Sequence, residues 1–389
     1  MMIRNALSGL LISFSLLLPA VSSSAATHDN DQPIHDISTR KKKALVIISS
    51  ARNLPLSSPR EVSTIPVGFF LVELAGMLRQ FGDRYDFTFA TADGQDPQID
   101  LNGLDLNFHV QGQEAPYLNA FSSFLNTDFG IPGIAGILGL SETPESAKRK
   151  RKAEFERRSL ELGAASKVLG SLNVTDAIPN THPEAKDYRS QAVAALSQGE
   201  DLTYLSLKDL VTQHRSNEGG FSLDNFDFVF IPGGHAPMVD LRDNALLGEV
   251  LNEMHEAGKL IVAICHGPIA LTSADLRVDS NLDPVDFSSS PLVGAEVTTV
   301  SKFEENLMLE IGYVKQPTLS GPTRLNYYVD EALKNDGFNV VYGSPMVFDL
   351  QLRPGYPKVV YDAFRNVLTS NGPQAMDALV EDMERRLAP

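Results

Sequence analysis

The only cysteine of the chain, Cys265, lies where a thiol can act as a nucleophile. It follows the all-apolar segment Leu260–Ile264 and precedes His266, Gly267 and Pro268. The apolar segment predicts a buried strand, and Pro268 suits the first turn of a helix. A side chain between a strand and a helix sits on a tight, strained turn that pushes it out at the edge of the sheet. The pattern therefore predicts a nucleophilic thiol.

The helix expected after Cys265 predicts a lowered thiol pKa. A helix N-terminus aims free N–H groups and a partial positive charge at the sulfur. Such surroundings lower a thiol pKa from about 8.5 towards about 3.5–7.5. We therefore expect a reactive thiolate that is readily alkylated and oxidised. The alternative is a structural cysteine buried in a core strand, with His266 an ordinary loop residue.

A second turn follows another apolar strand. Asp227–Ile231 reads as a buried strand, and the sequence Pro-Gly-Gly-His comes directly after it at Pro232–His235. The carboxyl ends of parallel strands meet at one edge of a sheet, where doubly wound folds place their sites. The backbone N–H groups of Gly233 and Gly234, together with that of His266, would then form an oxyanion hole.

The elements that must position these two turns alternate in type. Lys43–Ser49 reads as a buried strand, Val67–Phe81 as a helix and Tyr85–Thr91 as a second strand. Strand, helix and strand at this spacing predict a βαβ unit with a parallel sheet. We therefore expect an α/β fold: a doubly wound, mostly parallel, flavodoxin-like sheet sandwiched by helices.

The alternation breaks in the middle of the chain. Residues from about 110 to 222 show no pattern of a buried strand, but hold a glycine-rich run, Phe129–Leu140, and a charged helical stretch, Glu145–Leu169. We expect a large, mostly helical insertion here. It would interrupt a single α/β domain that spans residues 43–389.

The N-terminus has the composition of a secretory signal peptide. One positive charge, Arg4, precedes the apolar run Leu7–Val21, and the small residues Ser22–Ala26 follow. The alternative is a membrane anchor, but the run is short for a span of about 20 residues. We expect cleavage after residues 1–26, a flexible start at 27–42, and a mature protein without a membrane span that is periplasmic or secreted.

Composition excludes some classes of partner and bond. The 389-residue chain has a net charge of -16 and so repels phosphate backbones, which argues against nucleic-acid binding. One cysteine permits no disulfide within the chain. A lone thiol in an oxidising compartment is a liability unless it is used or buried.

Several segments resemble a known family. IPGGHAPMVDL at Ile231–Leu241 and AICHGPIAL at Ala263–Leu271 are similar to the ThiJ/PfpI superfamily, whose fold resembles the class I glutamine amidotransferase domain. The branch with heat-shock chaperone-like proteins and glutathione-independent glyoxalases (glyoxalase III) is the most similar. Weaker similarity to that branch lies at Val67–Leu78 and Val297–Glu305.

The resemblance, over about residues 43–110 and 223–389, implies a role for each residue that matches a family motif. The implied roles are Cys265 as nucleophile, His266 as catalytic histidine, Glu73 as the first-helix acid that touches the sulfur, Glu305 (with Glu304 as the fallback) as the acid that orients the histidine, and Gly234, beside Gly233 and His235, as oxyanion or binding residues.

The resemblance implies a small-molecule carbonyl substrate. A 2-oxoaldehyde such as methylglyoxal would become a 2-hydroxy acid, here lactate. The same site on an amide would give a peptidase or amidase, and a holdase chaperone with Cys265 as a sensor is a third hypothesis. The zinc site of some chaperone members is not recognisable, so no metal or cofactor is expected. A homodimer is left open.

Overall fold

The structure of this protein is a computed structural model. It describes residues 41–58, 64–104, 144–175, 183–199, 202–310, 323–347, 350–351 and 355–388. The expected signal peptide and the glycine-rich run Phe129–Leu140 lie outside the described residues. Among the described helices, none is both long and apolar enough to cross a membrane.

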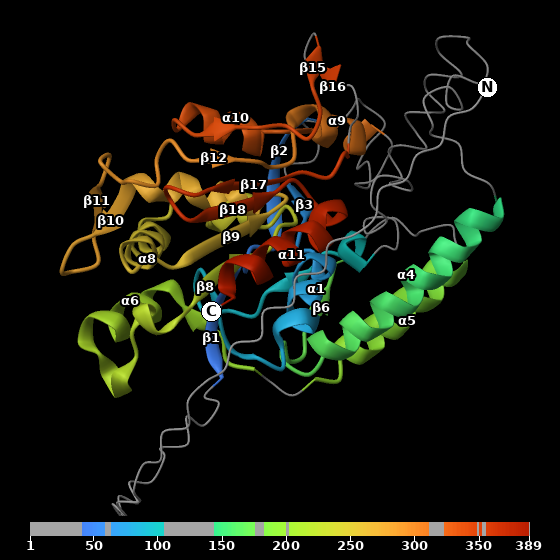
Figure 1. Ribbon diagram of the computed structural model, residues 1–389, viewed down its shortest axis with the longest axis horizontal. Helices are drawn as coiled ribbons and strands as arrows, with labels where there is room; N and C mark the ends of the chain where they lie inside the picture. The colour runs from blue at the N-terminus through green and yellow to red at the C-terminus, as the bar shows by residue number, and fades with distance from the viewer. Residues whose placement is uncertain are drawn as a thin grey trace, which may run out of the picture. The chain divides into compact units, whose positions relative to one another are not determined.

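A seven-stranded sheet forms the centre of the fold (Figure 1). Its order is β17 (Val359–Asp362), β18 (Val367–Ser370), β9 (Leu260–Ile264), β8 (Phe228–Ile231), β1 (Lys42–Ile48), β4 (Tyr85–Thr91) and β7 (Leu205–Ser206). All neighbouring pairs are parallel except the hairpin of β17 and β18. The expected α/β fold with a mostly parallel sheet is confirmed.

The sheet is apolar on both faces because helices cover both. Along β1, Leu45 and Ile47 point into one hydrophobic core, while Val46 and Ile48 point into the other. All four side chains are fully buried. This alternation follows from the two-residue period of a strand. It explains why the central strands read as continuous apolar runs in the sequence.

The helices divide between the two cores. One core contains residues of α1 (Leu71–Phe81), α4 (Pro144–Ala165), α5 (Pro183–Leu196) and α11 (Met376–Leu387). The other contains residues of α6 (Leu207–Ser216), α8 (Ala245–Glu256), α10 (Val329–Asn335) and the 3₁₀ helix η5 (Gly267–Asp275). The arrangement is the doubly wound one that the sequence predicts.

Short elements complete the described chain. The helices are α7 (Pro237–Asp240), α9 (Lys302–Glu310) and the 3₁₀ turns η1 (Leu101–Leu104), η3 (Glu218–Gly220), η4 (Leu223–Asn225) and η6 (Pro373–Ala375). Small sheets are formed by β2 (Asn53–Ser58), β3 (Thr64–Pro66) and β13 (Arg324–Leu325), by β5 (Gln98–Ile99) and β6 (Asn173–Val174), by β10 (Leu276–Val278) and β11 (Pro284–Asp286), by β12 (Glu296–Val297) and β14 (Asn339–Val340), and by β15 (Met346–Val347) and β16 (Leu350–Gln351).

One expectation about residues 110–222 is wrong. Leu205–Ser206 forms β7, which pairs with β4 at the edge of the main sheet. Two residues are too few to produce a strand pattern, so β7 could not be predicted from the sequence. In the same region α4 packs against α1 and α5. The boundaries of the expected insertion stay a prediction.

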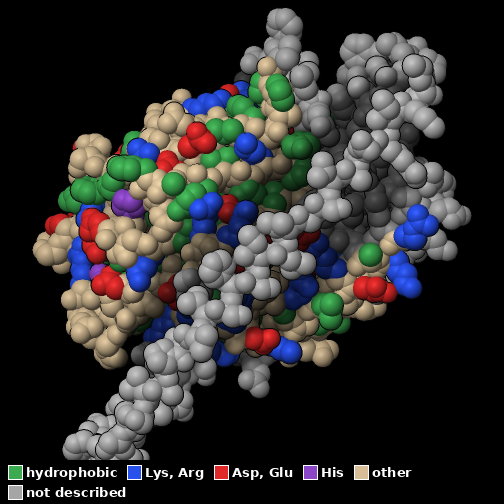
Figure 2. Space-filling model, in the orientation of Figure 1, with side chains coloured by type: hydrophobic (Ala, Val, Ile, Leu, Met, Phe, Trp, Pro, Cys, Tyr) green, Lys and Arg blue, Asp and Glu red, His purple; other side chains and the backbone are tan. Residues whose placement is uncertain are grey.

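The surface of the described residues carries both signs of charge. On the face shown in Figure 2, acidic and basic side chains lie interspersed. One set links α6, α8 and β10: Arg215 and Arg277 both bind the carboxylate of Glu249, at 2.8 and 2.9 Å. These ion pairs join α6 and α8 to β10.

Candidate active site

Cys265 sits on the strained elbow that the sequence predicts. It comes directly after β9, and its φ of 60° lies in the left-handed region that non-glycine residues avoid. Its N–H donates to the Ser370 carbonyl at 2.8 Å. Its carbonyl accepts from the Thr299 hydroxyl at 2.5 Å. Bonds on both sides of the residue therefore hold the strained conformation.

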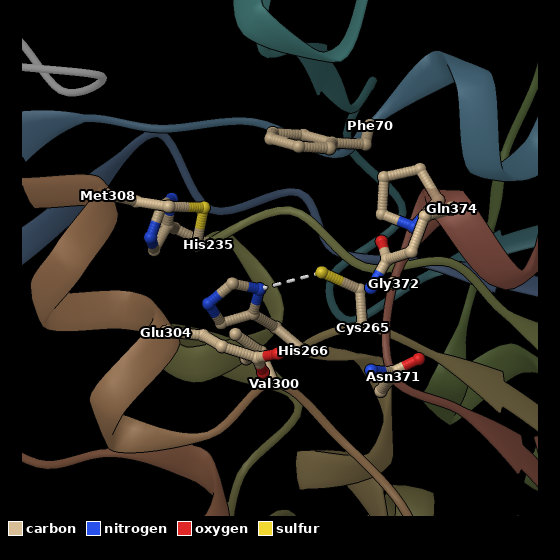
Figure 3. Close-up of a pocket in the computed structure, with 11 residues that line it drawn as sticks. Phe70, His235, Cys265, His266, Val300, Glu304, Met308, Asn371, Gly372 and Gln374 are labelled. Atoms are coloured by element: carbon tan, nitrogen blue, oxygen red, sulfur yellow. Dashed lines mark hydrogen bonds between the residues drawn. The ribbon is translucent and has the colours of Figure 1, made fainter. Parts of the chain in front are cut away.

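A histidine and a carboxylate line up behind the sulfur. His266 Nδ1 lies 3.2 Å from Cys265 Sγ, the contact drawn as a dashed line in Figure 3. Nε2 of the same ring lies 2.7 Å from Glu305 Oε2. His266 and Glu305 are each only 2 % exposed. The structure thus brings together three of the residues that the resemblance implies: nucleophile, histidine and orienting acid.

Glu305 also binds a second histidine. His235 Nε2 lies 2.8 Å from Glu305 Oε1, and the two imidazole rings lie 4.5 Å apart. Burial raises the pKa of Glu305, but the two histidines outweigh it and hold that pKa well below its ordinary value. The carboxylate is therefore ionised. It accepts an Nε2–H from each ring, and no sequence pattern indicates this second partner.

The pKa values of the two histidines are shifted in opposite directions. Burial lowers the pKa of His235, but the Glu305 carboxylate outweighs burial and raises it overall. Burial and then the charge of His235 lower the pKa of His266. His235 therefore holds the extra proton and His266 stays neutral. With Nε2–H directed at Glu305, the lone pair on His266 Nδ1 faces the thiol and can accept its proton.

Glu73 lies on the other side of the sulfur and is protonated at neutral pH. Its side chain is fully buried. Burial raises its pKa from 4.5 to about 8, against hydrogen bonds from Cys265 and Gly233 that lower it. Oε2 accepts the Gly233 N–H at 2.7 Å. Oε1 has no hydrogen-bond partner in the described part of the chain. Cys265 is the side chain that acts on this carboxyl as a hydrogen-bonding neighbour, so a proton on Oε1 can be donated to the sulfur.

The expectation of a lowered thiol pKa is wrong. Burial raises the pKa of Cys265 well above its ordinary value, and the Glu73 and Glu305 carboxylates add to the rise. The Gly234 N–H opposes it. Cys265 is 5 % exposed, so the cost of burying a charged sulfur outweighs the helix N-terminus. The thiol thus depends on its neighbours for activation.

The predicted oxyanion residues fall into separate roles. The Gly233 N–H is occupied by Glu73, so it is not free for an oxyanion. The Gly234 N–H bonds to the sulfur and stays beside it, at a φ of 85°. The His235 ring binds Glu305. Of the three, Gly234 is the one whose geometry suits an oxyanion donor.

Glu304, the fallback acid, also lines the cavity, but its carboxylate binds groups other than His266. Its Oε1 accepts the Gly355 N–H at 2.7 Å, and its Oε2 accepts from Ser301. It therefore anchors the start of α9 and the segment at Gly355. Glu305 is the acid that the structure places on His266.

The sulfur opens into a small, mostly apolar cavity of about 30 Å³. Four lining residues were named from the sequence: His235, Cys265, His266 and Glu304. The others were not: Phe70, Val300, Met308, Asn371, Gly372, Pro373 and Gln374. These extra residues come from α1's entry, α9 and the chain after β18, which are distant in sequence. Nothing local in the sequence marks them as neighbours.

One cluster has the composition of a metal site. Ligand atoms of His235, His266 and Glu305 lie within 4.8 Å of one another. Two histidines and a carboxylate are a set that binds transition metals. Here the Nε2 atom of each histidine donates its proton to Glu305, so neither Nε2 offers a lone pair to a metal ion. The geometry is that of a proton-holding pair.

Part of the chain matches a family model. Residues 205–281 match the model of the DJ-1/PfpI family. This segment includes both strand-end turns, at Gly233 and Cys265, and confirms the family resemblance read from their motifs.

Particular relatives follow from the same comparison. The chain is 34% identical over 146 residues to the protein/nucleic acid deglycase HchA of Staphylococcus aureus (strain bovine RF122 / ET3-1), which covers 36% of this chain and 44% of that protein. The chain therefore spans less than half the length of this relative. Among solved structures, glyoxalase III from Candida albicans aligns at 15% identity over 88% of this chain and 96% of that chain, with a TM-score of 0.42. The 24 kDa Rapid Encystment Protein of Francisella tularensis aligns at 14% identity over 90% and 100%, with a TM-score of 0.47.

Proposed function

We propose that this protein is a cysteine-dependent enzyme that converts small 2-oxoaldehydes to 2-hydroxy acids without glutathione, as a glyoxalase III does. The observation that carries the proposal is the line from Cys265 Sγ through His266 to Glu305, 3.2 and 2.7 Å long, beside a small apolar cavity. The similarity to a protein named as a deglycase also favours carbonyl chemistry.

The first step forms a bond between sulfur and the aldehyde carbon. His266 Nδ1 takes the thiol proton as Sγ attacks, and the carbonyl electron pair moves onto the aldehyde oxygen. The Gly234 N–H stabilises that oxygen, which then receives the proton from His266. The product is a hemithioacetal. Protonated Glu73 donates to the sulfur and so stabilises the developing thiolate.

The later steps move a hydrogen between two neighbouring carbons. His266 removes the proton from the former aldehyde carbon, and the electron pair shifts onto the adjacent ketone oxygen to give an enediolate. Return of that proton to the second carbon, with transfer of the hydroxyl proton from the first oxygen to the second, gives a 2-hydroxy thioester. Water then cleaves the carbon–sulfur bond, releasing the 2-hydroxy acid and the thiol. One carbon is oxidised and its neighbour reduced, so no external redox partner is needed.

The cavity favours a small carbonyl compound over a peptide. Its volume of about 30 Å³ is roughly twice what one buried water needs. A peptidase needs a groove that holds an extended chain on both sides of the scissile bond. Methylglyoxal is therefore the substrate that we test first.

The test is turnover of methylglyoxal in the absence of glutathione. Wild type should consume methylglyoxal and release lactate, and Cys265→Ser should lose at least about 10³-fold in kcat because it lacks the nucleophile. Circular dichroism of the variant checks that folding is intact. A wild type without turnover refutes the proposal. If such a wild type suppresses the aggregation of a client protein, and Cys265→Ser does so equally well, the holdase hypothesis replaces the proposed enzyme function.

A further inference from the structure

Two side-chain amides line the cavity, and the structure uses them differently. Asn371 has both ends occupied: its Nδ2 donates to the Tyr356 carbonyl at 2.9 Å, and its Oδ1 accepts the Lys358 N–H at 2.9 Å. Asn371 therefore holds the cavity wall together.

The second amide, that of Gln374, is unoccupied. Gln374 is 7 % exposed, and its side chain bonds to no residue in the described ranges. Gln374 lines the cavity, so an amide whose donor and acceptor are unused there can hydrogen-bond a ligand. Figure 3 shows the amide on the Cys265 side of the cavity, across from the His266 ring.

Glycine at position 372 makes this placement possible. A Cβ at Gly372 would lie 2.5 Å from Gln374 Oε1 and 3.0 Å from Nε2. Any other residue would push the amide away from its position. Beside this amide, Phe70, Val300 and Met308 present apolar surface to the cavity. The amide is thus a polar group in an apolar wall, which is how ligand sites fix orientation.

We propose that the Gln374 amide recognises the second oxygen of the substrate, the ketone oxygen beside the aldehyde that Cys265 attacks. Nε2–H donates to this oxygen. The bond strengthens when negative charge develops there in the enediolate. Gln374 thereby selects carbonyl compounds with two neighbouring oxygens. The inference rests on the proposed function and deepens it by assigning the residue that reads the substrate class.

Two substitutions of matched size test the assignment. Gln374→Met fills the same volume without a polar group, and Gln374→Glu keeps the acceptor but loses the donor. Both should lower kcat/KM for methylglyoxal by about 10²-fold, as loss of one donor to a developing oxyanion does. Alkylation of Cys265 by methyl iodide, which has no oxygen to recognise, should be unchanged.

The outcomes separate recognition from damage to the nucleophile. Wild-type kcat/KM in Gln374→Met overturns the assignment. The assignment is also overturned if Gln374→Met lowers the rate of Cys265 alkylation by methyl iodide by the same factor as kcat/KM. If wild type does not turn over methylglyoxal, the proposed function fails, and protection decides the role of Gln374. The methylglyoxal concentration that halves alkylation of Cys265 should then rise in Gln374→Met, and an unchanged value overturns the assignment.

Discussion

Protonation of Glu73 connects the chemistry of the site to the stability of the fold. The carboxyl is fully buried, and a charge there would be close to the sulfur and far from water. Its pKa is raised to about 8, so the folded protein binds a proton that the unfolded chain releases at a much lower pH. Stability from this group is full below the unfolded pKa and is lost as pH rises through the folded one.

The Glu73→Gln variant tests this link. Glutamine keeps the acceptor for the Gly233 N–H and a donor for the sulfur, but cannot ionise. Wild type should lose on the order of 4 kcal/mol of unfolding free energy relative to Glu73→Gln between about pH 5 and pH 8. Urea unfolding of both proteins across this range measures it. A constant difference would mean that Glu73 is ionised throughout.

His235 tunes the catalytic base through the carboxylate that both histidines share. Its positive charge lowers the pKa of His266, which must be neutral to accept the thiol proton. In His235→Gln, an amide replaces the charge but still donates to Glu305. The pKa of His266 should rise, so the acid limb of kcat/KM should move to higher pH. The pH–rate profile reports the shift.

A control separates charge from contact in that prediction. His235→Phe removes both the donor and the charge, so it should lower kcat further than His235→Gln. An acid limb that stays in place in His235→Gln would contradict the role given to His235. The position of the acid limb decides the question even if His235→Gln keeps its full turnover.

At the scale of elements, close packing of the turn after β8 against the elbow after β9 fixes the distance between acid and sulfur. A Cβ at Gly233 would lie 2.7 Å from Glu73 Oε2 and 2.7 Å from Cys265 Cβ. Glycine is therefore required by space and not by its dihedral angles. A larger residue must move the nucleophile, the acid or both.

The Gly233→Ala substitution should therefore abolish most activity, and its matched control should not. We expect kcat to fall by about 10²-fold or more, because displacements near 1 Å are that costly in catalysis. Gly163→Ala lies in α4, where an added Cβ meets nothing within 4 Å. It should keep wild-type kcat and gain up to about 1 kcal/mol of stability. Equal activity in both variants would contradict this account.

Strand-end turns were the part of the site that sequence could locate. Continuous apolar runs mark β8 and β9, and the residues after them had to share a sheet edge. The second bond of Glu305, to His235, could not be predicted from the sequence, because it depends on how α9 packs against the turn after β8. The place of Gln374 in the cavity likewise depends on tertiary packing. The direction of the pKa shift of Cys265 was predicted wrongly, because the burial of this side chain could not be judged from the sequence.

At the scale of the whole molecule, the sheet was predictable and its edge was not. Long apolar strands with helices between them specify a doubly wound sheet. β7 contributes two residues, and its pairing with β4 comes from tertiary context alone. The net charge of -16 is a property of the whole chain that argues against nucleic-acid partners.

Export is a second property of the whole chain, and we propose it from the N-terminal sequence alone. Residues 1–26 lie outside the described residues, so the proposal depends on their charged, apolar and small-residue order. Mass spectrometry of the protein purified from its native source should find an N-terminus between Val21 and His28. An intact Met1 would refute the proposal.

The central claim is that the substrate carbon bonds to Cys265 Sγ. Acid quenching during turnover of methylglyoxal, followed by peptide mass spectrometry, tests it directly, because a 2-hydroxyacyl thioester survives in acid. In wild type the peptide that contains Cys265 should carry one lactoyl group, and Cys265→Ser should show neither adduct nor turnover. Lactate formation by Cys265→Ser at a rate near that of wild type, or an adduct on another residue, would contradict it.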